Sequence, residues 1–313
     1  MTRVLYLVLI SAFCIVTFCK NDYCQATEIS PVFGVGQENF TFELNDFDPG
    51  DKRKTVKFEP NIAGITRLGV DAFGFGVGYS FRGSEKSTNP AFGKTQFDDW
   101  QLGYHAKNWG VETFYQVYTG FHTVNTAAIQ VYPNLSFRHV GITARYSIGD
   151  EEFTVSGLMD QSVPVNSTSG KYYVLMGYDE HNFNTDTPLL QAENAGFNTG
   201  IENLRSLKSN DFKLGFGAGK YWLINDCFFF GGMFDVLATY ANYKFESTTG
   251  KDTKSDVTGS YNARLAIGYK ESNFRLGISL ATDATVLKTP ADTGVIKPSA
   301  NKLLAYWRYF FDW

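Results

Sequence analysis

Apolar and polar residues alternate with a period of two along most of this 313-residue chain. In the segment 261–270, the odd positions carry Tyr, Ala, Leu, Ile and Tyr, whereas the even positions carry Asn, Arg, Ala, Gly and Lys. Successive side chains of a strand point to opposite faces, so this pattern predicts β-strands with one apolar face. About twelve segments have this character: 56–72, 75–83, 96–108, 110–121, 136–149, 152–164, 170–182, 212–224, 227–246, 258–271, 273–288 and 299–313.

The lengths of these segments favour strands that cross a membrane. Most exceed the mean soluble strand of about five to six residues and reach the roughly 9–11 residues that a tilted membrane strand needs. Short polar turns join several segments, and longer polar segments lie at 84–95, 183–211, 247–257 and 289–298. Together they predict an all-β protein, a transmembrane antiparallel up-and-down β-barrel of about 12 strands over residues 55–313.

The order of short and long connections leaves the number of strands open. Short turns follow odd-numbered segments in the first half of the chain and even-numbered segments in the second half. An up-and-down barrel places its short turns at one end. Either some early connections on the periplasmic side are long, or a strand near 183–211 has been miscounted.

The last strand ends in aromatic residues, in the sequence NKLLAYWRYFFDW. Trp307, Tyr309, Phe311 and Trp313 share one face of a strand. In this respect the chain resembles outer-membrane barrels as a class, which finish on an amphipathic strand with an aromatic last residue. That resemblance implies that these four residues form a C-terminal assembly signal, read by the barrel assembly machinery.

The N-terminus is typical of a secretory signal peptide. Arg3 precedes an apolar run from 4 to 19, and small residues precede Thr27, so we expect cleavage after Ala26. An uncleaved membrane anchor is the alternative. Residues 1–26 are then the signal peptide, and residues 27–54 are predicted to be a periplasmic lead or partial plug. The mature chain retains Cys227 alone, so it forms no intrachain disulfide.

Three short motifs add a family resemblance. Pro60-Asn61 opens a glycine-rich hairpin, Tyr118-Thr119-Gly120 ends a strand rich in Tyr and Gln, and Pro133-Asn134-Leu135 precedes a long strand. Over roughly 55–310 the chain resembles the domain-of-unknown-function family 4421. The resemblance implies an outer-membrane barrel of a Gram-negative bacterium and no established activity.

No recognisable catalytic, cofactor or metal motif occurs in the sequence. A G-x-S-x-G elbow, an H-E-x-x-H helix and the His-x-Ser pattern of outer-membrane phospholipases are all absent. Asp46, Asp48 and Asp51 are too few for a calcium loop, which needs more oxygen ligands. We therefore predict no enzyme and no cofactor, and interpret the four histidines as polar lining or interface residues: His105, His122, His139 and His181.

Charged residues on the less apolar strand faces are the candidates for the barrel interior. They are Glu112, Arg138, Arg145, Asp235, Arg264, Arg275, Asp283 and Arg308. Two interpretations remain open: a network of arginines and carboxylates that fills the barrel, or a narrow pore whose arginines favour anions.

The preferred function is an outer-membrane barrel of structural or narrow small-solute or anion-channel type. The alternatives are an outer-membrane lipid-modifying hydrolase and a secreted soluble β-protein that binds a ligand. Expected partners are outer-membrane lipid, the assembly machinery and a small solute. The net charge of −4 argues against nucleic acid.

Overall fold

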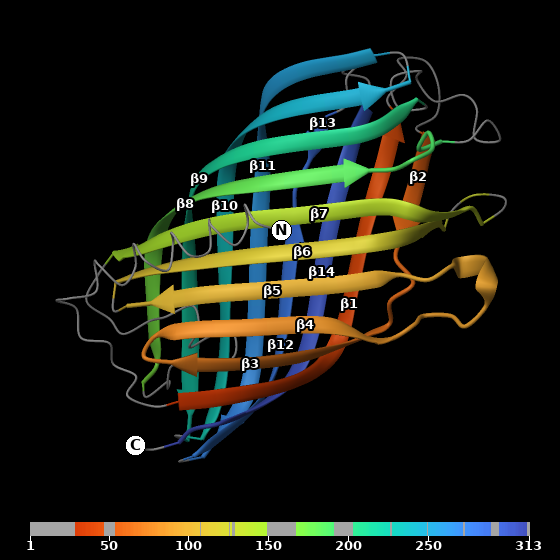
Figure 1. Cartoon of the computed structure of the whole chain (residues 1–313). Coiled ribbons are helices and arrows are strands. Elements are labelled where there is room, and N and C mark those ends of the chain that lie inside the picture. Colours follow the sequence, from red (N-terminus) through yellow and green to blue (C-terminus); the bar gives the residue numbers. More distant parts are fainter. Residues whose placement is uncertain are drawn as a thin grey trace.

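The computed structural model is a closed antiparallel β-barrel (Figure 1). It describes residues 29–46, 54–106, 108–124, 126, 129–148, 167–190, 203–225, 227–248, 250–271, 273–288 and 294–311. Twelve strands form the ring, and they are β1 (Ile29–Asp46), β3 (Gly64–Ala72), β4 (Phe75–Ser84), β5 (Gln96–His105), β6 (Trp109–Thr123), β7 (Val131–Ile148), β8 (Ser169–Asn184), β9 (Leu204–Ile224), β10 (Phe228–Ser247), β11 (Gly250–Lys270), β12 (Phe274–Ala284) and β14 (Gly294–Tyr309).

The ring closes where the first strand pairs with the last. β1 and β14 are antiparallel over the whole register from Val32–Arg308 to Asp46–Gly294. Two short strands, β2 (Lys54–Glu59) and β13 (Leu287–Lys288), pair with the extended ends of β1 and β14. A 3-10 turn, η1 (Pro90–Phe92), lies between β4 and β5. No helix in the described part of the chain is long and apolar enough to cross a membrane.

The two ends of the barrel differ in their connections. Both ends of the described chain, Ile29 and Phe311, lie at what we call the turn end, where they form a β-bridge with each other. The short connections β3–β4, β5–β6, β9–β10 and β11–β12 are at this end, together with the long connection from β7 to β8. The connections between β4 and β5 and between β8 and β9, which are also long, are at the opposite, loop end. With β1 counted as the first strand of the ring, these short turns follow the second, fourth, eighth and tenth strands. The sharp β10–β11 turn follows the ninth strand and is at the loop end.

The polarity of the strands reverses half-way along the barrel. On the outward face of β10, Phe228, Phe230, Phe234, Val236 and Tyr240 are exposed near the turn end. The same outward face continues toward the loop end with Asn242, Lys244 and Glu246, while Tyr243 and Phe245 turn inward and are buried.

The reversal has a physical explanation in the length of the strands. β9, β10 and β11 are 21, 20 and 21 residues long, about twice what a tilted strand needs to cross a bilayer. The half near the turn end has an apolar outside, as a membrane barrel does, and the loop half has a polar outside and an apolar core, as a water-soluble barrel does.

The structure corrects several sequence predictions. The predicted strand 56–72 is divided into β2 and β3, and the predicted loop 289–298 includes residues 294–298 of β14. Residues 29–46 were predicted to be a lead or plug but form β1, whose outward face is apolar at Phe33 and Val35 and polar from Gln37 onward. The segments 183–211 and 247–257 were predicted to be loops, but 204–211 and 250–257 belong to β9 and β11. The predicted strand 152–164 lies outside the described residues.

The family motifs hold the loop end together. Asn61 is fully buried, and its Nδ2 donates to the carbonyl oxygens of Ser87 at 2.8 Å and Gly93 at 2.9 Å. Its Oδ1 accepts from the Ser87 backbone N–H at 2.9 Å. Its own backbone N–H donates to Thr95 Oγ1 at 2.7 Å, and this hydroxyl in turn donates to the Gly120 carbonyl at 2.7 Å. Asn61 therefore joins the β2–β3 connection to the β4–β5 connection and, through Thr95, to strand β6.

Gly120 is required by this arrangement. Its φ is 92°, and a Cβ there would lie 2.1 Å from the carbonyl oxygen of Lys94. Only glycine adopts this conformation without strain. The third motif places Asn134 Nδ2 2.8 Å from Asp186 Oδ2 and buries Leu135. The three motifs thus have structural roles at the loop end.

Replacing Asn61 with Ala should lower the free energy of unfolding by about 3 kcal/mol, since three side-chain hydrogen bonds are lost at roughly 1 kcal/mol each. Asn39→Ala, at an exposed outward position of β1, is the matched control and should change it little. Urea unfolding of the refolded barrel measures both. Equal effects of the two substitutions would contradict the role given to Asn61.

Candidate functional site

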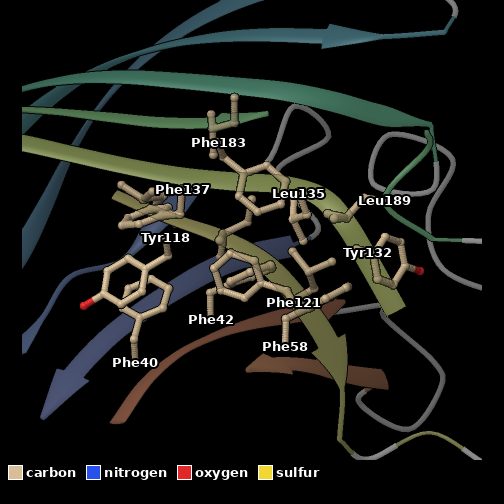
Figure 2. Close-up of a cluster of buried hydrophobic side chains, with 14 of the residues drawn as sticks. Phe40, Phe42, Phe58, Tyr118, Phe121, Tyr132, Leu135, Phe137, Phe183 and Leu189 are labelled. Carbon is tan, nitrogen blue, oxygen red and sulfur yellow. The ribbon is translucent and has the colours of Figure 1, made fainter. Parts of the chain in front are cut away.

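The interior of the loop half is filled by an aromatic cap. We define the cap as Phe40, Phe42, Phe58, Tyr118, Phe121, Tyr132, Leu135, Phe137, Phe183 and Leu189, all buried (Figure 2). Phe42 lies at its centre, stacked on Phe58 at 4.5 Å and in edge contact with Phe183 at 4.9 Å between ring centroids. Phe42 is on β1 and Phe183 on β8. In one direction β14, β12, β11, β10 and β9 lie between them, and in the other β2, β6 and β7 do, because β2 pairs with both β1 and β6 at this level. The cap therefore crosses the full width of the lumen.

Below the cap, charged groups cross-link the walls. The hydroxyl of Tyr118 donates to the buried carboxylate of Glu38, so the aromatic cap and the charged layer share this contact. Lys302 Nζ lies 3.2 Å from Glu38 Oε2 and also pairs with the buried carboxylate of Asp99. Lys302 on β14 and Asp99 on β5 have three strands between them on the shorter path around the ring.

A second node lies on Arg145. Its guanidinium pairs with Glu112 and, at 3.2 Å, with Asp235 Oδ2. Tyr173 donates its hydroxyl hydrogen to the other oxygen of Asp235 at 2.6 Å. Arg264 approaches Glu112 at 3.6 Å from the opposite wall, with four strands between β6 and β11. These side chains link five strands, β6, β7, β8, β10 and β11.

A polar chamber of about 260 Å³ lies among these groups. It extends from Phe40 and Phe137 of the cap to Asp71 and His105 near the turn end. Its lining contains equal numbers of basic side chains and carboxylates, five of each. The basic residues are Arg67, Arg145, Lys213, Arg264 and Lys302, and the acidic residues are Glu38, Asp71, Glu112, Asp179 and Asp283. The lining therefore has no excess of positive charge.

The structure places seven of the eight predicted lumen residues on the inward face. Glu112, Arg145, Asp235 and Arg264 form the node just described. Asp283 lines the chamber. Near the turn end, Arg308 pairs with Asp71 and donates to Ser30 Oγ at 2.7 Å, and the Arg275 guanidinium lies 4.8 Å from the Phe310 ring centroid.

Arg138 is the exception, and the prediction for it was wrong. It lies on the outward face of β7, where its guanidinium is 2.6 Å from Glu180 Oε1. Lys208 also contacts Glu180, at 2.7 Å. Counting by twos through β7 places Arg138 with Val140 and Ile142 rather than with Arg145. Arg138, Glu180 and Lys208 lie outside the barrel, on the loop-end side of its apolar outer surface.

The four histidines separate into different environments. His122 is in the loop half, beside Phe92 with an edge contact at 5.0 Å, and burial lowers the pKa of its imidazole. His105 is 3.9 Å from Glu112 in the chamber. His139 and His181 lie opposite each other on β7 and β8, with ring centroids 4.1 Å apart. Sequence reasoning did not pair these two, because 42 residues separate them and only the strand register brings them together.

The aromatic residues of the last strand share one face, as predicted. Trp307 and Phe311 are exposed on the outside of the barrel, and Tyr309 lies between them, 4.8 Å from Phe311. Trp313 lies outside the described residues, as do Asp48, Asp51 and Ala26. Asp46 is the last residue of β1.

A model for one protein family matches most of the chain. The family is described as a domain of unknown function, DUF4421, and the match covers residues 34–298. The chain belongs to the DUF4421 family. The matched region begins inside β1, so it includes the closing strand that the resemblance over 55–310 left out.

Comparison with curated proteins found no match. Among solved structures, the outer membrane protease OmpT of Escherichia coli has a TM-score of 0.41 at 11% identity, over 92% of this chain and 98% of that one. OmpT of Vibrio cholerae has a TM-score of 0.31 at 11% identity, over 90% and 98%. A Pseudomonas aeruginosa FadL homologue has 0.29 at 9%, over 94% and 93%. These values carry no inference about activity.

Arg145→Met should destabilise the barrel by about 3–5 kcal/mol, because it leaves the buried carboxylate of Asp235 without its cation. Arg138→Met on the same strand should cost less than about 1 kcal/mol, since that guanidinium is partly exposed outside the barrel. Denaturant unfolding of the two variants in parallel measures the difference. A loss for Arg138→Met as large as that for Arg145→Met would contradict the assignment of faces.

Proposed function

We propose that the protein is an outer-membrane barrel with a sealed lumen, which has a structural or ligand-holding role and is not an open channel. The contact between Phe42 and Phe183 carries this proposal, because it joins opposite walls of the ring. The polar chamber below the cap then communicates with one side of the membrane alone.

The outer surface supports the membrane location. Exposed apolar side chains surround the turn half, among them Leu68, Ile142, Leu214, Phe234 and Ile278. Such a surface is far larger than the apolar patches of soluble monomers, and a bilayer is the environment that covers it. Short turns of bacterial barrels face the periplasm, so we place the turn end there and the capped loop end at the cell surface. Export by a signal peptide cleaved after Ala26 belongs to the same proposal.

The charge pattern favours a sealed barrel over an anion pore. Each of Arg145, Arg308 and Lys302 faces at least one carboxylate, and the chamber lining has equal numbers of cations and carboxylates. An anion-selective pore would need unpaired positive charge to raise the local anion concentration. We therefore propose that these groups hold the walls together.

The contacts also favour a non-enzymatic role over a hydrolase. A serine hydrolase needs its nucleophile hydrogen-bonded to a histidine base. Ser209 lies opposite His181 in the register, but its hydroxyl donates to Asp211. Both Ser209 and Asp211 are buried beneath the cap.

Planar-bilayer recordings test the seal. We expect the refolded wild-type barrel, verified by its heat-dependent shift on gels, to insert without stepwise conductance in 1 M salt. An open porin recorded in the same lipid is the positive control. Stable conductance steps from the verified protein would contradict the sealed lumen.

Trp313→Ala should reduce the amount of assembled barrel in the outer membrane, because it removes the last aromatic residue of the proposed assembly signal. Trp222→Ala is the matched control, since Trp222 is exposed on the apolar outside of β9 away from the terminus. Quantitative gels of membrane fractions compare the two variants. Equal levels would count against a C-terminal signal.

A further inference from the structure

Two histidines and an aspartate converge inside the chamber. His139 on β7 and His181 on β8 are direct partners in the strand register, and their rings stack at 4.1 Å. Asp179 is two residues from His181 on the same face of β8 and lies with its Oδ2 3.2 Å from His139 Nε2. One donor atom from each of the three residues lies within 4.8 Å of the other two.

Several ligand atoms of this cluster are buried without a hydrogen bond. Neither ring nitrogen of His181 has a hydrogen-bond partner among the described residues, although this side chain is 3% exposed. Asp179 Oδ1 and Asp211 Oδ2 are likewise unbonded. Asp211 Oδ2 lies 3.3 Å from His181 Nε2. Buried polar atoms are nearly always satisfied, so this concentration of lone pairs points to a missing partner.

We propose that His139, Asp179 and His181 bind one divalent first-row transition-metal ion of the zinc type, with Asp211 as a further carboxylate ligand. Imidazole nitrogens and carboxylate oxygens are ligands that Zn²⁺ takes at about 2.0–2.2 Å. Two ligand atoms of a tetrahedral site at such lengths are about 3.4 Å apart. The distances of 3.2 Å and 3.3 Å in the cluster are close to this spacing.

The position of the cluster suits an exchangeable ion. His139, Asp179 and His181 all line the polar chamber, so a bound ion retains access to water and to small ligands there. The cap closes the chamber toward the loop end.

Lys213 competes with the ion for the carboxylate. Its ammonium pairs with Asp179 Oδ2, the oxygen that also faces His139. Metal binding must displace this charge, which lowers the affinity. Removal of the ammonium in Lys213→Met should therefore strengthen metal binding, a result that a purely structural salt bridge does not predict.

A proton is the alternative occupant of the cluster. Protonated His181 would form an ion pair with Asp211 and satisfy part of the same lone pairs. In that case the folded barrel binds no stoichiometric metal near neutral pH. The experiment separates these two outcomes.

Titration of the metal-stripped, folded barrel with Zn²⁺ by calorimetry, and with Co²⁺ by visible absorption, tests the proposal. We expect one equivalent to bind, with Co²⁺ showing d–d bands of low-coordinate geometry. His181→Gln and Asp179→Asn should each weaken binding at least about tenfold. His105→Gln, in the same chamber but outside the cluster, should leave it unchanged.

Absence of stoichiometric binding, or equal binding by wild type and His181→Gln, would overturn the site. If the substitutions at His181 or Asp179 prevent folding, Lys213→Met remains decisive, because unchanged or weaker binding by the folded variant contradicts the proposal. The titration does not depend on whether the barrel conducts, so its outcome and that of the bilayer recordings are independent.

Discussion

The pairing of β1 with β14 is the constraint on which the rest of the structure depends. A strand edge in hydrocarbon would leave a row of backbone N–H and C=O groups without partners, at several kcal/mol each. The register from Val32–Arg308 to Asp46–Gly294 satisfies these groups over the full height of the barrel. Closure also fixes a lumen with two opposite walls, and the side chains inside it have to meet across that space.

The interior uses two different solutions at its two levels. In the turn half, where the outside is apolar, the lumen contains charged side chains that pair across the ring. Examples are Glu112 with Arg145 and Arg264, and Lys302 with Asp99. Beyond the belt the outside becomes polar, so the inside can become a hydrophobic core, centred on Phe42. The hydroxyl of Tyr118 on Glu38 joins the two levels. A sealed barrel with a one-sided polar chamber follows from this division.

The sequence predicted what depends on local periodicity. The strands from β3 to β12 near the turn end, and the outward face of Trp307 and Phe311, were correct because apolar residues alternate there in one consistent sense. β1 was missed because its apolar residues face outward up to Val35 and inward beyond it. Over the whole strand neither face is consistently apolar, so the period-two pattern is weak. Arg138 was predicted on the inward face of β7, but inward residues there have odd numbers, as Arg145 does. A shift of one residue along a strand moves a side chain from the lumen to the outside. The cluster of His139, Asp179 and His181 depends on register between strands, which no single segment contains.

Residue-level accessibility on intact cells tests the central claim, that the turn half is in lipid and the loop half stands outside it. In a Cys227→Ser background, Phe234→Cys and Lys244→Cys place one thiol at each level on the outward face of β10. A membrane-impermeant maleimide should label the protein with Lys244→Cys and leave that with Phe234→Cys unmodified. Labelling of both at equal rates, or of neither until the cells are lysed, would contradict the account.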